Sequence, residues 1–171
     1  MKRALVCLLL LPAMAGCASE PLPDLGPAPA YETALRDGSA IALADLQGEV
    51  VVLNLWATWC GPCKHEMPLI EELYQEFRAE GLRVLAVSMD DFPDSEERID
   101  AFVNEAGLTY DIAWDKGGDA FVPAFFPHGS LGTPPETYLI GRDGHIVAFW
   151  AGAFDPNEAK NRDLVERALA A

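Results

Sequence analysis

The sequence predicts an α/β domain built on a central mixed sheet with helices on both faces. Residues 50–57 (VVVLNLWA) form a continuous apolar run rich in β-branched residues, as in a central strand that is covered on both faces. Residues 62–80 follow with apolar side chains at helical spacing. Strand and helix patterns then alternate, and the chain closes with two strands and a helix, an order that indicates a mixed sheet.

The chain begins with a pattern typical of a secretory signal peptide. Two cations, Lys2 and Arg3, precede an apolar run at residues 4–11, and small residues follow. This run is too short to span a bilayer. Residues 1–16 are therefore predicted to be a signal peptide.

The sequence Met14-Ala15-Gly16-Cys17 resembles the lipobox of bacterial lipoproteins. That resemblance implies that Cys17 becomes the lipidated first residue of the mature protein, anchored to a membrane on its extracytoplasmic (periplasmic) side. The alternative is ordinary cleavage after Ala13-Met14-Ala15. Ordinary cleavage would leave an odd number of cysteines and so a free thiol in an oxidising compartment, whereas lipidation removes that thiol.

Residues 18–30 contain four prolines and show no apolar periodicity. A segment of this composition is semi-rigid and extended, at about 3.1 Å per residue. We therefore expect residues 17–30 to be the lipidated cysteine with a Pro-rich tether, and residues 31–171 to be one folded domain.

The other strands follow from local patterns. An Asp-Gly turn signal at residues 37–38 precedes an alternating run at residues 39–43, consistent with an N-terminal β-hairpin extension. A second strand of the sheet is predicted at residues 83–89 and an edge strand at residues 110–114. A closing hairpin is predicted around Arg-Asp-Gly, with strands at residues 137–140 and 145–151.

Each later helix has a recognisable start. A helix is predicted at residues 94–106, with Asp94 and Glu97 at the spacing of a capping box. The acidic cluster over residues 90–97 is interpreted as a solvated helix start rather than a cation site. For the last helix, Asp155 is the predicted N-cap and Pro156 the first helical residue.

The composition excludes several classes of protein. The chain has 171 residues, 50% of them hydrophobic, which is enough to bury a core. Twelve Lys and Arg against 27 Asp and Glu give a net charge of −15. Such a chain repels phosphate backbones, so no nucleic-acid partner is expected. Four cysteines are too few for a disulfide scaffold at this length.

The motif that carries chemistry is Trp59-Cys60-Gly61-Pro62-Cys63, at the junction of the buried strand and the first helix. A Cys-x-x-Cys at such a junction indicates a redox pair. Cys60 would lie at the helix N-terminus, where unpaired N–H groups and the helix dipole favour a thiolate. Cys63 would lie one turn inside the helix, shielded from solvent.

Two other interpretations of this pair are weaker. A structural zinc site needs four ligands, yet there is no second Cys pair and His65, His128 and His145 are scattered. A purely structural disulfide would gain little by closing so short a loop. The sequence therefore predicts a redox pair with no metal and no cofactor.

On three motifs the chain resembles the thioredoxin-like TlpA/ResA/CcmG group of extracytoplasmic thiol–disulfide oxidoreductases, which are redoxins related to the AhpC/TSA proteins. The motifs are WATWCGPC at residues 56–63, EMP at residues 66–68 and PETYLI at residues 135–140. The resemblance runs from about Ala30 to the last helix and implies a thioredoxin-like fold.

The resemblance also implies roles for individual residues. Cys60 attacks a substrate disulfide, Cys63 resolves the mixed disulfide, and Pro135 is a cis-proline that faces the pair. Trp59 is expected to shield the sulfurs. In this family the residue before the cis-proline pairs its backbone with the substrate; here that residue is Pro134, which has no N–H to donate.

The chain departs from thioredoxin in the position of its acid. Thioredoxin has a buried aspartate six residues before its first cysteine, where this chain has Asn54. Glu66 instead lies three residues after Cys63 and so on the same helical face. Since ResA-like proteins have a glutamate at that place, we interpret Glu66 as the relocated acid; the alternative is a first-turn glutamate that complements the helix dipole.

The direction of reaction follows from the two residues between the cysteines. Gly-Pro is the dipeptide of reducing thioredoxin (~−270 mV) rather than of the oxidant DsbA (~−120 mV). We expect a reductase of protein disulfides, supplied with electrons by a membrane thiol donor of the DsbD/CcdA kind. Pro-Glu-Thr after the cis-proline resembles CcmG, which serves cytochrome c maturation.

Two rival functions remain open. A Sco-like copper-binding module would use Cys-x-x-x-Cys with a distal His, and the spacing here is one residue short, although His128 or His145 could still serve. A thiol peroxidase of the peroxiredoxin kind would have Thr three residues before its cysteine, where this chain has Ala57.

Overall fold

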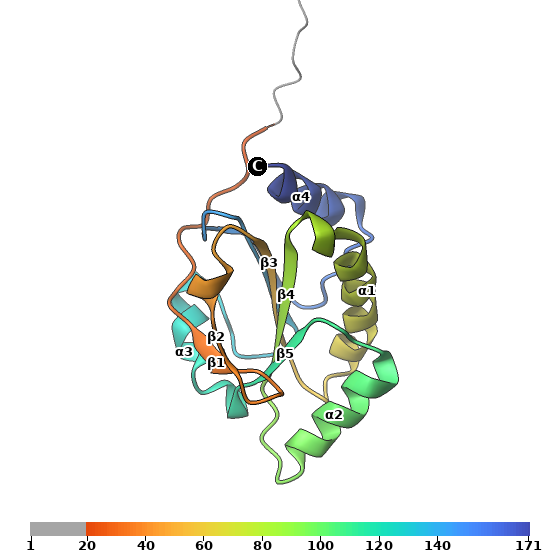
Figure 1. Cartoon of the computed structure of the whole chain (residues 1–171). Helices are drawn as coiled ribbons and strands as arrows, with labels where there is room; N and C mark the ends of the chain where they lie inside the picture. The colour runs from red at the N-terminus through yellow and green to blue at the C-terminus, as the bar shows by residue number, and fades with distance from the viewer. Residues whose placement is uncertain (1–19) are drawn as a thin grey trace, which may run out of the picture.

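The computed structural model describes residues 20–171 (Figure 1). The predicted signal peptide and Cys17 lie outside the described residues. Within the described range, no helix is both long enough and apolar enough to cross a membrane.

Five strands form the central sheet in the order β5-β4-β3-β6-β7. β3 (Val50–Trp56), β4 (Leu82–Ser88) and β5 (Asp111–Trp114) run parallel to one another. β6 (Glu136–Ile140) runs antiparallel to β3, and β7 (Ile146–Ala151) antiparallel to β6. The predicted mixed sheet, its edge strand β5 and its closing hairpin are confirmed.

β3 is buried along its whole length because it separates two apolar cores. Its residues Val50, Val52 and Trp56 face one core, and the alternate residues face the other. The first core is covered by α1 (Gly61–Phe77), α2 (Ser95–Ala106) and α4 (Ala159–Ala170), which lie on one side of the sheet in Figure 1.

The second core lies under the N-terminal hairpin and the short helix α3 (Phe121–Phe125), on the other side of the sheet in Figure 1. The hairpin consists of β1 (Glu32–Ala34) and β2 (Ala40–Ala42), which pair antiparallel. The predicted hairpin extension is therefore confirmed. Phe121 and Phe125 are fully buried here and stack on each other with ring centroids 4.5 Å apart.

Two predicted helix starts are wrong in detail. Asp94 precedes α2, but no side-chain capping bond forms, because its carboxylate pairs with Arg98 at 2.8 Å. α4 begins at Ala159, not beside Asp155. The carboxylate of Asp155 accepts the backbone N–H of Asn157 at 2.8 Å, so it closes a turn before the helix.

Residues 20–30, which we call the strap, pack against the domain rather than extending freely as a tether. The N–H groups of Leu25 and Ala28 donate to Ile146 and Gly144, and the N–H of Ile146 donates back to Gly26. The strap thus pairs with the start of β7 at Ile146 and with the turn that precedes it. Further along the chain, Arg36 donates its N–H to Ile112, at the edge of β5.

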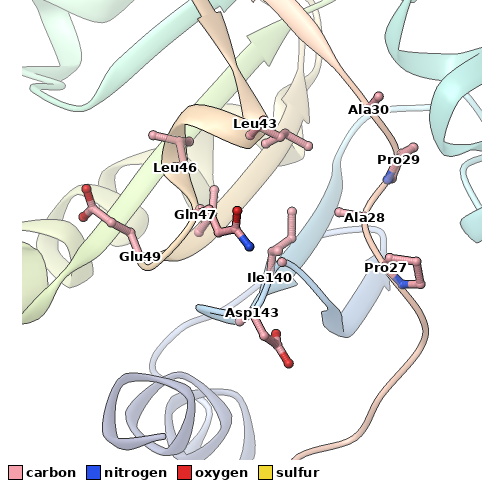
Figure 2. A pocket seen from close by; sticks show the side chains of 14 residues that line it. Pro27, Ala28, Pro29, Ala30, Leu43, Leu46, Gln47, Glu49, Ile140 and Asp143 are labelled. Carbon is pink, nitrogen blue, oxygen red and sulfur yellow. The ribbon is translucent and has the colours of Figure 1, made fainter.

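The strap runs beside a surface cavity of about 330 Å³. In Figure 2, Pro27, Ala28 and Pro29 form one side of this cavity, with Leu46 and Ile140 across from them. The strap begins near the C-terminal helix, since Arg167 on α4 donates to the carbonyl groups of Glu20 and Pro21 (2.8 and 3.1 Å).

Candidate active site

Cys60 and Cys63 form a disulfide where β3 passes into α1. Cys60 is the N-cap of the helix, and its Sγ accepts the backbone N–H of Cys63 at 3.2 Å. Cys60 is 4% exposed and Cys63 fully buried. In the reduced protein, the same N–H and the helix dipole favour negative charge on the Cys60 Sγ.

The residues around the pair follow the helix start. Pro62 lies in the first turn of α1, where its missing N–H costs no helix bond. Gly61 is exposed, and a Cβ there would meet nothing within 4 Å. Trp59 is 54% exposed, so its indole lies open to solvent beside Cys60.

The two prolines lie at the same end of the sheet as the disulfide. β6 pairs its first residue, Glu136, with Leu55 of β3, which brings Pro135 to the carboxyl end of β3. The Pro134–Pro135 peptide bond is cis, at the position expected from the sequence. We call this end of the sheet, where β3, β4 and β5 end and β6 begins, the redox end.

Glu136 organises the loop that leads to these prolines. Its buried carboxylate accepts the hydroxyl of Ser130 at 2.6 Å and the backbone N–H groups of Leu131 and Thr133 at 2.7 and 3.3 Å. From the sequence, Glu136 was noted only as part of the PETYLI motif. Its role in the loop was not predicted, because its partners lie in an irregular segment.

Glu66 is a residue of α1 and is 2% exposed. One carboxylate oxygen accepts the amide of Asn54 at 2.8 Å, and the other accepts the backbone N–H of Phe154 at 2.7 Å. The Asn54 amide also donates to Thr137 at 2.9 Å, while its Oδ1 has no hydrogen-bond partner. Asn54 therefore links the acid to both β3 and β6.

Burial raises the pKa of Glu66 to about 7, against the opposing effect of the bonds from Phe154 and Asn54. A carboxyl with this pKa exchanges its proton near neutral pH, which is the property that an acid–base group needs. A first-turn glutamate that only complemented a helix dipole would lie in solvent, so the burial favours the relocated acid.

The acidic cluster over residues 90–97 divides into two parts. Asp91, Asp94, Glu96 and Glu97 are exposed, as a solvated helix start should be. Asp90 is fully buried, so this interpretation is wrong for that residue. The sequence held no signal for the difference, because Thr58, which bonds both carboxylate oxygens of Asp90, lies on another segment.

A surface cavity of about 550 Å³ adjoins the redox pair on the side of the helix start. Glu66 lines it together with Gly61, Pro62, His65, Leu69, Ala153, Phe154 and Asp155.

Across residues 20–171, no three His, Cys, Asp or Glu side chains are grouped so as to hold a metal ion.

Comparison with known proteins assigns the family. Residues 26–149 match the model of the AhpC/TSA family, which covers more than half of the chain. The chain belongs to the AhpC/TSA family. Within that family, Ala57 is buried three residues before Cys60, so no hydroxyl stands at the position where peroxiredoxins carry Thr.

Its relatives within this AhpC/TSA family are named for thiol chemistry. The chain is 40% identical over 117 residues to the thiol-disulfide oxidoreductase ResA of Oceanobacillus iheyensis, covering 68% of this chain and 57% of that protein. It is 33% identical over 135 residues to the thioredoxin-like protein YneN of Bacillus subtilis, covering 79% and 75%. The chain thus spans little more than half the length of the first relative.

A solved structure supports the fold of this family member. The one assigned as the thiol:disulfide interchange protein DsbE of Chlorobium tepidum aligns with a TM-score of 0.73 at 25% identity, covering 87% of this chain and 99% of that one. The thioredoxin-like fold expected from the sequence is confirmed.

Proposed function

We propose that this chain is an extracytoplasmic thiol–disulfide oxidoreductase that reduces disulfides in proteins. The observation that carries the proposal is the Cys60–Cys63 disulfide at the start of α1, with Cys60 at the surface end and Cys63 buried. The names of the relatives support the same chemistry.

In the proposed reaction the Cys60 thiolate attacks a substrate disulfide and releases one substrate thiolate. Cys63 then attacks the Cys60 Sγ, which releases the second substrate thiolate and leaves the Cys60–Cys63 disulfide. Two electrons and two protons pass to the substrate in each cycle. A membrane thiol donor of the DsbD/CcdA kind would restore the dithiol by the reverse exchange.

Glu66 is the proposed acid–base group for Cys63. The two residues lie three positions apart on one face of α1, and both are buried. Cys63 must lose its proton before it attacks, and a neighbouring carboxyl whose pKa lies at about 7 can accept it. Glu66→Gln should therefore slow exchange and flatten its pH profile; an unchanged profile would contradict this role.

The substrate class is tested by trapping. In Cys63→Ala the mixed disulfide on Cys60 cannot be resolved, so the substrate stays bound and can be identified by mass spectrometry. Cys60→Ala is the matched control, since it lacks the attacking sulfur. Protein partners on Cys60 alone support the proposal, and an apocytochrome among them would assign cytochrome c maturation. An empty trap together with failure to reduce insulin would refute it.

Membrane attachment is proposed through lipidation of Cys17. Cys17→Ala should release the protein from the membrane fraction or block its processing, because the acyl chains would be lost. Persistence of the variant in the membrane fraction would contradict the lipid anchor.

A further inference from the structure

A buried aspartate outside the motif contacts the segment that carries Cys60. Asp90 lies two residues after the end of β4 and is fully buried. One carboxylate oxygen accepts the hydroxyl of Thr58 at 2.6 Å, and the other accepts the backbone N–H of Thr58 at 2.8 Å and the hydroxyl of Ser88 at 2.6 Å. All three donors are neutral groups, so no cation pairs directly with this carboxylate.

Thr58 is the second residue of the turn that ends at Cys60. The N–H of Cys60 donates to the carbonyl of Ala57 at 3.1 Å, which closes this turn. Thr58 is 7% exposed, and Asp90 takes both of its hydrogen-bond donors. On the outer side, Trp59 is largely in solvent. The contacts with Asp90 therefore hold this turn from inside.

Asp90 is itself held by neighbouring strands. Its N–H donates to Ser88 Oγ at 3.2 Å, and its carbonyl accepts the indole N–H of Trp114, at the end of β5, at 2.8 Å. The next residue back, Met89, donates its N–H to Trp56 at the end of β3. Backbone and side-chain bonds at residues 89–90 thus fix the carboxylate relative to the ends of β3, β4 and β5, and the carboxylate in turn fixes Thr58.

We propose that Asp90 is a positioning residue for the redox pair. This inference rests on the proposed thiol–disulfide function. Only a carboxylate offers two oxygens for the three donors, whereas an amide offers one. By fixing Thr58, Asp90 holds the Cys60 Sγ within reach of Cys63 in the dithiol, which raises the effective concentration of one thiol toward the other. Disulfide formation is then favoured.

The test is the equilibrium between the protein and glutathione. The protein dithiol and one glutathione disulfide give the protein disulfide and two glutathione thiols, so electrons and protons balance. In Asp90→Asn, this equilibrium constant should fall about tenfold, the effect of losing one hydrogen bond of ordinary strength. Thr58→Val keeps the backbone bond and loses the hydroxyl, so it should shift the constant in the same direction by roughly threefold.

Asp115→Asn is the matched control. Asp115 is also a buried carboxylate, and it accepts the backbone N–H groups of Ala120 and Phe121 but bonds no residue of the turn at Cys60. This variant should lose stability and leave the glutathione equilibrium unchanged. The inference is overturned if Thr58→Val and Asp90→Asn leave the equilibrium unchanged, or if Asp115→Asn shifts it equally.

If Asp90→Asn does not fold, Thr58→Val decides the question by itself. Because glutathione is the only reaction partner in this measurement, it needs no protein substrate. Failure of the substrate trap and failure of this inference are therefore separate results.

Discussion

At the two ends of the central sheet, backbone groups of the loops are hydrogen-bonded by side chains of opposite charge. At the redox end, buried carboxylates accept backbone N–H groups. At the other end, guanidinium groups donate to backbone carbonyls: Arg142 contacts those of Gly48, Glu80 and Leu169 at 2.8–3.0 Å. Arg167 contacts those of the strap in the same way.

The direction of the chain explains the arginine side of this division. α1 and α2 follow the parallel strands β3 and β4, so they begin at the redox end and leave N–H groups without helix partners there. α1, with the 3-10 turn that follows it at Arg78–Glu80, and α4 end near the opposite side, where carbonyl groups are left over; the carbonyls of Glu80 and Leu169 are among them. The arginines complement carbonyl groups at that end, whereas the carboxylates of the redox end accept N–H groups of loops and of the start of α3, not those of α1 or α2.

The carboxylates at the redox end and the arginines at the other end differ in burial. All four carboxylates that are buried within residues 20–171 lie at the redox end: Glu66, Asp90, Asp115 and Glu136. Arg142 and Arg167 are half-buried, so water can replace them. Loss of a carboxylate should therefore cost far more stability than loss of an arginine.

Glu136→Ala tests the stronger side of this comparison. Removal of the carboxylate leaves three donors without an acceptor, two of them backbone N–H groups. We expect a loss of about 4 kcal/mol in the free energy of unfolding. Urea denaturation measures it, and Glu32→Ala, an exposed residue of β1, is the control. A loss similar to that of the control would show that water enters this loop.

Glu66 should make stability depend on pH in an unusual direction. Its folded pKa is raised from 4.5 to about 7, so the folded state binds more protons than the unfolded state between these values. Stability contributed by the protonated carboxyl is present below pH 4.5 and is lost as pH rises to about 7, by up to about 3 kcal/mol.

Paired denaturation curves of the wild type and Glu66→Gln isolate this contribution. Glutamine does not titrate, so the variant should lose less stability than the wild type between pH 4.5 and 7. Parallel losses in the two proteins would show that Glu66 stays ionised.

Arg142→Ala tests the weaker side. The variant loses three bonds to carbonyl groups, but water reaches those groups. The expected loss is about 1 kcal/mol by urea denaturation. Arg98→Ala, which removes an exposed pair with Asp94, should change stability by less than about 0.5 kcal/mol. A loss for Arg142→Ala that equals that of Glu136→Ala would break the comparison.

The smallest effect is expected where the strap meets the sheet. Asp24 hydrogen-bonds His145 at 2.9 Å and raises the pKa of the imidazole above its usual 6.5. Asp24→Asn should return the pKa of His145 toward that value in an NMR titration. The stability that this pair contributes is present below pH 6.5 and is lost as pH rises through the raised pKa. An unchanged titration would show that the pair does not form.

Local sequence patterns were sufficient to predict the features that depend on residues close together in the chain. The apolar run of β3 and the spacing between Cys63 and Glu66 gave the central strand and the candidate acid. The contacts of Glu66 with Phe154 and of Asp90 with Thr58 join segments far apart in the chain, so no local pattern reports them. The partners of Glu136 are close in sequence but lie in an irregular loop without a recognisable pattern. Asp155 has a good helix-start signal, yet its carboxylate closes a turn first.

The strap has a consequence for how other polypeptides can approach the sheet. An open sheet edge invites a strand from another chain. The strap pairs with the first residue of β7, Ile146, and its Pro27 and Pro29 have no N–H to offer to an added strand. Arg36 covers β5 at the opposite edge. A polypeptide that adds to the central sheet therefore cannot pair with Ile146 or with Ile112, because the protein's own N-terminal segment already occupies these two positions.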